Sequence, residues 1–139
     1  MFIDEIKIYA QAGHGAFLNG QPLRVSGIDT ISAAALSAGN LKTLASGPQW
    51  SRYGSLVAQV SRIRGYGDFL HYHLLAAGKI DAVIESDVNI LDIAALVAIV
   101  TEAGGVFTQL DGGAISLDST TVLAANRTLH PQILVAMAG

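Results

Sequence analysis

The sequence predicts an α/β protein: a layered α/β/α domain with a largely parallel sheet, preceded by an antiparallel β-hairpin. Near the start of the 139-residue chain, an Asn-Gly pair separates two short apolar runs, which is typical of a hairpin. Beyond residue 30, short β-type runs alternate with segments of helical spacing, as in a parallel sheet joined by helices. Charged residues make up only 14%, against about 25% in typical domains, which excludes a disordered or coiled-coil chain.

The opening segment is expected to be antiparallel. Residues 3–10 alternate with the period of two that indicates a strand. Residues 16–18 and 22–25 flank Asn19-Gly20 and should form the hairpin. Because an isolated hairpin is only marginally stable in water, we interpret this one as part of a larger sheet, with no third strand in this chain to complete it.

The later elements are expected to alternate between strands and helices. Gly78 should close the second of four helices as its C-terminal cap. The third helix is apolar almost all round, so we expect it to be buried between layers. The expected strands are residues 31–38, 62–66, 81–85, 106–108 and 121–124, and the expected helices are residues 50–60, 69–77, 92–103 and 129–137.

Composition excludes several classes of function. The net charge is −3 and basic residues are scattered, so no nucleic-acid-binding surface is expected. The absence of cysteine excludes a disulfide scaffold, a zinc ribbon and a thiol nucleophile. No apolar run reaches the roughly 20 residues of a membrane span, and no signal peptide is recognisable. We therefore expect a cytoplasmic protein without membrane contact.

Acidic residues at element ends are the candidates for chemistry. Asp92 begins the apolar third helix, where it is either an N-cap or a ligand for a metal or phosphate group. Glu85 closes a strand, and the carboxyl ends of strands border the ligand crevice of open α/β sheets. A solvated strand end is an interpretation that fits Asp87 better than Glu85.

The histidines and the usual nucleotide motifs suggest no site. His71 and His73 are two residues apart on an expected helix, so they point to different faces and cannot share a metal. There is no Gly-x-Ser-x-Gly elbow and no Walker lysine. We expect surface or packing roles for all four histidines: His14, His71, His73 and His130.

Several segments have a joint spacing that points to a family. They are the hairpin at residues 12–20, Arg64-Gly65-Tyr66-Gly67-Asp68, residues 74–81, Leu91-Asp92-Ile93-Ala94-Ala95, Thr101-Glu102-Ala103-Gly104-Gly105 and Ala124-Ala125-Asn126. Over almost the whole chain, this order resembles the C-terminal half of the inositol monophosphatase family. The Gly67-Asp68 pair is similar to the histidinol-phosphate phosphatase branch.

The resemblance implies a phosphomonoesterase that uses Mg²⁺ to activate water and hydrolyses a small alcohol phosphate, of the inositol monophosphate or histidinol phosphate type. It assigns Asp92 as a metal ligand, an oxygen donor of the kind Mg²⁺ prefers. It assigns Glu85 to the alcohol portion of the substrate, and Gly67 and Asp68 to the substrate loop. Leu91 stands where the family usually has an aromatic residue.

One departure from the family pattern has a large consequence. The family's other metal ligands lie on an earlier Glu-Glu pair and on an Asp-Pro-x-Asp-Gly segment, and neither occurs in this sequence. We therefore expect a truncated phosphatase: residues 1–28 as a remnant of the N-terminal sheet and residues 29–139 as the C-terminal domain. The isolated chain would hold no catalytic residue, be inactive, and form a homodimer through its hairpins.

Two alternatives stay open. The chain could be a non-catalytic remnant that acts only in folding or assembly. It could also be a plain α/β domain in which Asp92 merely caps a helix.

Overall fold

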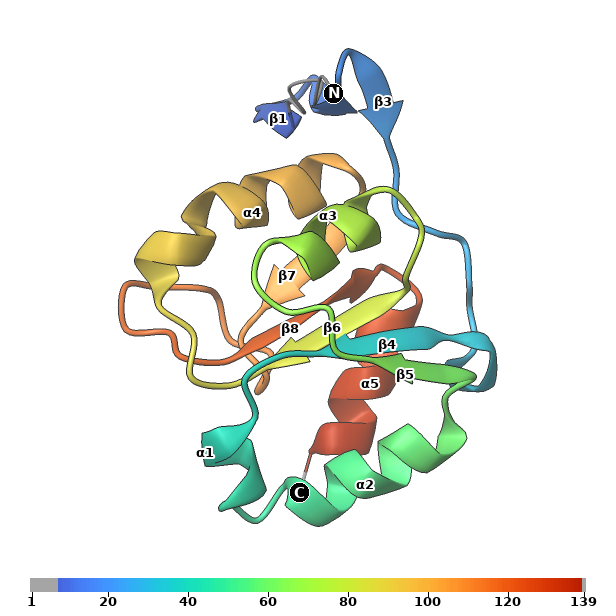
Figure 1. Ribbon diagram of the computed structural model, residues 1–139, viewed down its shortest axis with the longest axis vertical. Helices are drawn as coiled ribbons and strands as arrows, with labels where there is room; N and C mark the ends of the chain where they lie inside the picture. Colours follow the sequence, from blue (N-terminus) through green and yellow to red (C-terminus); the bar gives the residue numbers. More distant parts are fainter. Residues whose placement is uncertain (1–7, 139) are drawn as a thin grey trace, which may run out of the picture.

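A computed structural model of the chain describes residues 8–138, except for the side chain of Asp92 (Figure 1). The described residues form two sheets and a set of short helices. The elements are β1 (Ile8–Gln11), β2 (Gly15–Leu18), β3 (Gln21–Leu23), the 3₁₀ turn η1 (Ile31–Ala33), β4 (Ala35–Ala38), α1 (Lys42–Ala45), α2 (Trp50–Gln59), β5 (Arg62–Arg64), α3 (Leu70–Ala76), β6 (Ala82–Glu85), α4 (Ile90–Glu102), β7 (Gly105–Thr108), β8 (Val122–Asn126) and α5 (Leu129–Met137).

The central sheet has the order β5-β4-β6-β8-β7 among the described strands. β4 pairs in parallel with β5 and β6, whereas β8 runs antiparallel to both β6 and β7. Four of these five strands therefore point the same way. Helices α3 and α4 cover one face, and α1, α2 and α5 lie on the other (Figure 1). The predicted layered α/β/α domain is confirmed, and its sheet is mixed: two of its strand pairings are parallel and two are antiparallel.

Side chains alternate across this sheet and divide the core in two. Leu36 of β4 and Ile84 of β6 pack with α2 and α5 on one face. Ala35 and Val83 pack with α3 and α4 on the other. Since successive residues of a strand point to opposite faces, Ser37 and Glu85 fall on the α3–α4 face.

The N-terminal strands form a separate three-stranded sheet. Asn19 and Gly20 have φ of 49° and 82°, the left-handed pair that a tight hairpin turn requires, so the predicted hairpin is confirmed. The expectation of no third strand is wrong, because β1 also pairs with β2. Residues 3–7 of the predicted first strand lie outside the described residues.

Helix α4 supports this small sheet. Ala16 is buried against Ile99 of the helix and against its C-cap, Ala103, and the Gly15 amide donates to the Glu102 carboxylate at 3.0 Å. Figure 1 shows the sheet on the side of α4 remote from the central sheet. The predicted division of the chain after residue 28 stays a prediction.

Two buried polar side chains anchor the segment that joins the sheets. The Asn126 amide donates to the carbonyls of Ser26 and Ile28, at 3.1 and 2.8 Å. The Asp81 carboxylate accepts from the Ser26 hydroxyl at 2.5 Å and from the Ala35 amide at 2.7 Å. Both side chains thus hold the connection across one end of the central sheet.

The structure corrects two expectations about the third helix. It begins at Ile90, and its N-cap is Asn89, whose Oδ1 accepts from the Leu91 amide at 2.9 Å. Asp92 is the third helical residue, so its interpretation as the N-cap is wrong, and its side chain lies outside the described residues. The helix packs between two sheets but is not buried all round.

The exposed part of α4 is a face of apolar residues. Leu91 stands where the family that the sequence resembles usually has an aromatic residue. Its side chain is 77% exposed, so it contributes little to packing. Ala94, Ala95 and Ala98 are also exposed. In the described part of the chain, no helix has the length and apolar character needed to cross a membrane.

Candidate functional site

A pocket of about 450 Å³ opens beside the carboxyl ends of β4, β5 and β6. These strands are parallel, so their ends meet at one edge of the sheet, where open α/β sheets bind ligands. Three loops line the pocket, through Gly39 and Asn40 after β4, Gly67 and Asp68 after β5, and Glu85, Asp87 and Asn89 at and after β6. The structure therefore brings together the predicted substrate residues Gly67, Asp68 and Glu85.

Asp92, the predicted metal ligand, lies in the first turn of α4. Asn89 and Ile93 both line the pocket, so the first turn of α4 borders it. Among the described residues, no three His, Cys, Asp or Glu side chains gather as they would around a metal ion. The described residues therefore do not fit a complete metal site by themselves.

The lining of the pocket is acidic. Asp68, Glu85 and Asp87 contribute carboxylates, and no Lys, Arg or His is among the described residues that line the pocket. Clefts lined by one sign of charge concentrate ligands of the other sign. This pocket favours a cationic group or a metal ion over a free anion.

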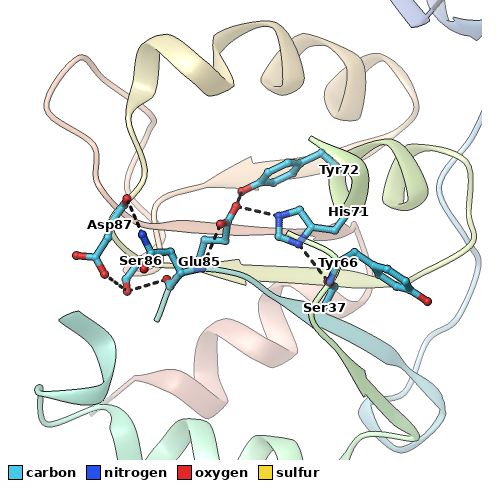
Figure 2. Close-up of polar contacts among 8 residues, drawn as sticks. Ser37, Tyr66, His71, Tyr72, Glu85, Ser86 and Asp87 are labelled. Carbon is cyan, nitrogen blue, oxygen red and sulfur yellow. Dashed lines mark hydrogen bonds and ion pairs between the residues drawn. The ribbon is translucent and has the colours of Figure 1, made fainter. Parts of the chain in front are cut away.

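Glu85 is the most constrained of the three carboxylates. It is only 7% exposed, and its Oε1 lies 2.9 Å from His71 Nε2 and accepts from the Tyr72 hydroxyl (Figure 2). Its Oε2 accepts from the backbone amide of Asn40 at 3.4 Å. Burial alone would raise the pKa of Glu85, but the hydrogen bonds from His71 and Tyr72 outweigh it and lower that pKa below its usual value.

Tyr72 and His71 are themselves fully buried on α3. Burial, followed by the charge of Glu85, raises the pKa of Tyr72 far above its usual value, so the phenol keeps its proton and remains a donor. The Tyr72 ring stacks on Phe107, with centroids 5.4 Å apart, and meets the His71 ring edge-on at 4.5 Å. The donors to Glu85 are therefore held rigidly.

Asp87 is exposed and orders the neighbouring loop. Its carboxylate accepts from the Thr43 amide at 2.9 Å, from the Thr43 hydroxyl, and from Ser86 Oγ at 2.9 Å. These bonds from Thr43 and Ser86 lower the pKa of Asp87. The predicted solvated strand end is confirmed as to exposure, with the added role of holding α1 beside the pocket.

The loop after β5 turns sharply at its two predicted residues. Gly67 and Asp68 both have positive φ, 68° and 48°, a conformation that glycine adopts freely and that aspartate tolerates better than most residues. Asp68 is exposed at the pocket. Its carboxylate can therefore meet a ligand directly.

Sequence reasoning missed the groups that hold Glu85. The expected packing role fits His130, which is buried and whose Nε2 lies 2.8 Å from Thr108 Oγ1. The contact of His71 with Glu85 was not expected. No local pattern joins Ser37, His71 and Tyr72 to Glu85, because the contacts span three elements. Asn40 could have been found, since it lies two residues after the carboxyl end of β4.

Fold and pocket together define the class of the protein: a layered α/β domain with a small-molecule pocket at the carboxyl ends of parallel strands. The chain belongs to the inositol monophosphatase family, whose model matches residues 3–138. The histidinol-phosphatase of Mycobacterium tuberculosis is 38% identical over 134 residues, 93% of this chain and 51% of that protein. Inositol monophosphatase 1 of Bos taurus is 37% identical over 142 residues, 93% and 49%.

Solved structures agree with this assignment. The extragenic suppressor protein suhB of Bartonella henselae matches with a TM-score of 0.86 and 28% identity, covering 95% of this chain and 52% of that one. The inositol monophosphatase of Anabaena matches with a TM-score of 0.84 and 25% identity, covering 95% and 54%. The resemblance drawn from the sequence is confirmed, and the chain spans about half the length of these relatives.

Replacing Gly39 by alanine should destabilise the protein. A Cβ at this position would lie 2.7 Å from Glu85 Cδ and closer still to Oε2, so the buried carboxylate would have to move. We expect the free energy of unfolding to fall by about 1–3 kcal/mol, as is typical of overpacking. Urea unfolding measures this change. Gly54→Ala is the matched control, because open space surrounds that helical glycine. It should be stabilising by about 0.5–1 kcal/mol, and equal effects of the two changes would contradict the close approach at Gly39.

Proposed function

We propose that this chain forms the alcohol-binding side of a phosphomonoesterase active site. The substrate class is a small alcohol phosphate, of the histidinol phosphate or inositol monophosphate type. The observation that carries the proposal is the pocket at the strand ends, where Asp68 and the firmly held Glu85 present carboxylates. The relatives named histidinol-phosphatase and inositol monophosphatase support it.

The charge of the pocket favours an amino alcohol over a neutral polyol. Carboxylates of Asp68 and Glu85 accept hydrogen bonds, and such bonds are strongest from a charged donor such as an ammonium group. The phosphate end of the same substrate would be repelled by the carboxylates of Asp68, Glu85 and Asp87. It therefore has to lie away from Asp68 and Glu85, next to a cation.

We propose Mg²⁺ as that cation, with Asp92 as one of its ligands. The family resemblance and the position of Asp92 in the first turn of α4 support this role. When bound, such an ion neutralises phosphate and acidifies a water molecule. The described residues do not complete a metal site, so the remaining ligands would come from elsewhere. A cytoplasmic location stays a prediction.

The alcohol portion alone should bind to the chain. In an NMR titration of the ¹⁵N-labelled protein, we expect L-histidinol to shift the amide signals of Gly67, Asp68 and Glu85 more strongly than myo-inositol does. Asp68→Asn and Glu85→Gln should each weaken binding roughly tenfold, which corresponds to 1.4 kcal/mol. Asp118→Asn is the control, since this exposed carboxylate does not line the pocket. Equal loss in the control, or no binding of either alcohol, would count against the proposed function.

Hydrolysis is a separate matter, for which we expect a negative result. The purified 139-residue chain should release no phosphate from histidinol phosphate or inositol monophosphate at millimolar Mg²⁺, because a single candidate ligand segment cannot hold a catalytic metal site. Phosphate release would be followed colorimetrically, with Asp92→Ala as the comparison. Turnover that disappears in Asp92→Ala would show that the chain is catalytic on its own.

We further propose a homodimer that forms through the N-terminal sheet. Tyr9 is 42% exposed and stacks on Phe17 with centroids 5.3 Å apart, on a sheet whose edge strands can pair with a second copy. Light scattering at micromolar concentration should give twice the mass of 14.4 kDa. Tyr9→Lys should shift the protein to monomer, and Asp118→Lys should not. A monomeric wild-type protein would refute the dimer.

A further inference from the structure

We propose that Ser37, His71 and Tyr72 are positioning residues, which fix the Glu85 carboxylate so that only its Oε2 faces a ligand. Their effect on binding rests on the proposed function, in which Glu85 meets the alcohol. Their effect on Glu85 itself rests on geometry alone. Figure 2 shows Ser37 of β4 beside His71, and His71 and Tyr72 of α3 facing Glu85 at the end of β6.

The direction of the hydrogen bonds follows from the donors available. Ser37 Oγ accepts from the Tyr66 amide at 3.2 Å and lies 3.1 Å from His71 Nδ1. Ser37 is fully buried, and among the described residues its hydroxyl has two hydrogen-bond partners, the Tyr66 amide, which can only donate, and His71 Nδ1, which can accept. The serine therefore donates to His71, which makes Nδ1 the unprotonated nitrogen of a neutral ring.

This tautomer sets what His71 does at the site. With Nδ1 occupied as an acceptor, the ring proton is on Nε2, which donates to Glu85 Oε1 at 2.9 Å. The bonds then run in one direction, from the Tyr66 amide through Ser37 and His71 to the carboxylate. A protonated ring would also donate from Nδ1 and leave the buried Ser37 proton without its acceptor, which is unfavourable.

Tyr72 completes the fixation of Oε1. Its hydroxyl donates to the same oxygen as His71, so both lone-pair directions of Oε1 are used. Oε2 instead lies against Gly39 and receives one long bond, from the Asn40 amide at 3.4 Å. Since Gly39 and Asn40 line the pocket, Oε2 is the oxygen left to accept from a ligand. The site is thereby specific for a donor at one position.

The test compares variants that remove single donors. Tyr72→Phe removes one hydrogen bond to Glu85 Oε1, and His71→Leu removes the other. Ser37→Ala removes the donor to His71 Nδ1, so the ring is no longer held in one tautomer. His71→Gln is the conservative variant, because its amide can still donate to Oε1. Tyr53→Phe and His73→Gln are matched controls, a buried tyrosine of α2 and a second histidine of α3. Thermal unfolding and ¹⁵N spectra establish which variants keep the fold.

Two NMR readouts decide the positioning role without any ligand. The ¹⁵N shifts of the His71 ring should show a neutral Nε2–H tautomer in the wild type and a tautomer mixture in Ser37→Ala. The ¹³C titration of the Glu85 carboxyl should move to higher pH in Tyr72→Phe and His71→Leu, stay close to wild type in His71→Gln, and not move in the controls. An Nδ1–H tautomer in the wild type, or an unshifted Glu85 in Tyr72→Phe, would overturn the proposal.

The effect on recognition is measured with L-histidinol as the probe. We expect Tyr72→Phe and His71→Leu to bind it at least about fivefold more weakly, as when a charge-assisted hydrogen bond is lost, with His71→Gln close to wild type. Unchanged affinity for L-histidinol in both Tyr72→Phe and His71→Leu would show that these two residues do not affect binding. Failure of the wild type to bind would instead refute the proposed function, while the two NMR readouts still decide the positioning role.

Discussion

The buried carboxylate at the end of β6 is the constraint to which the surrounding residues conform. A charge that is nearly removed from water is strongly unfavourable unless hydrogen-bond donors surround it. At Glu85 those donors come from α3 and from the loop after β4. Gly39 is the residue that leaves space for the second oxygen. The positions of His71 and Tyr72 on α3 and of Gly39 at the pocket wall thus match the needs of one ionised group.

The two ends of β6 show why position decides the role of a carboxylate. Asp81 just before the strand and Glu85 at its end are both buried acids. Asp81 is used by the fold, since it accepts from Ser26 and the Ala35 amide. Glu85 has reached the edge at which three parallel strands end, where loops diverge and leave a pocket. The same side-chain chemistry is structural at one end and faces a ligand site at the other.

The sequence was sufficient wherever a local rule determined the outcome. Gly67, Asp68 and Glu85 follow or end strands, so their meeting at one pocket could be predicted once the strands were recognised. The alternative interpretation of Asp92 as a cap fails because Asn89, three residues earlier, is an equally good cap and takes that position. His71 could not be connected with Glu85, because that contact depends on how α3 crosses the sheet. The exposed apolar face of α4 could not be predicted, because a helix that is apolar almost all round does not show in its sequence which side is covered.

The charge of the pocket lining also determines which part of the proposed substrate this chain could bind. Asp68, Glu85 and Asp87 give this edge of the sheet a negative lining, which under the proposed function would attract hydroxyl or ammonium donors of the alcohol and repel the phosphate. The phosphate therefore needs a positive partner that the described lining lacks. Under the proposed function, this chain would contribute recognition of the alcohol. Because the donors from Tyr72 and His71 keep Glu85 ionised and oriented before any ligand arrives, that recognition would require little rearrangement on binding.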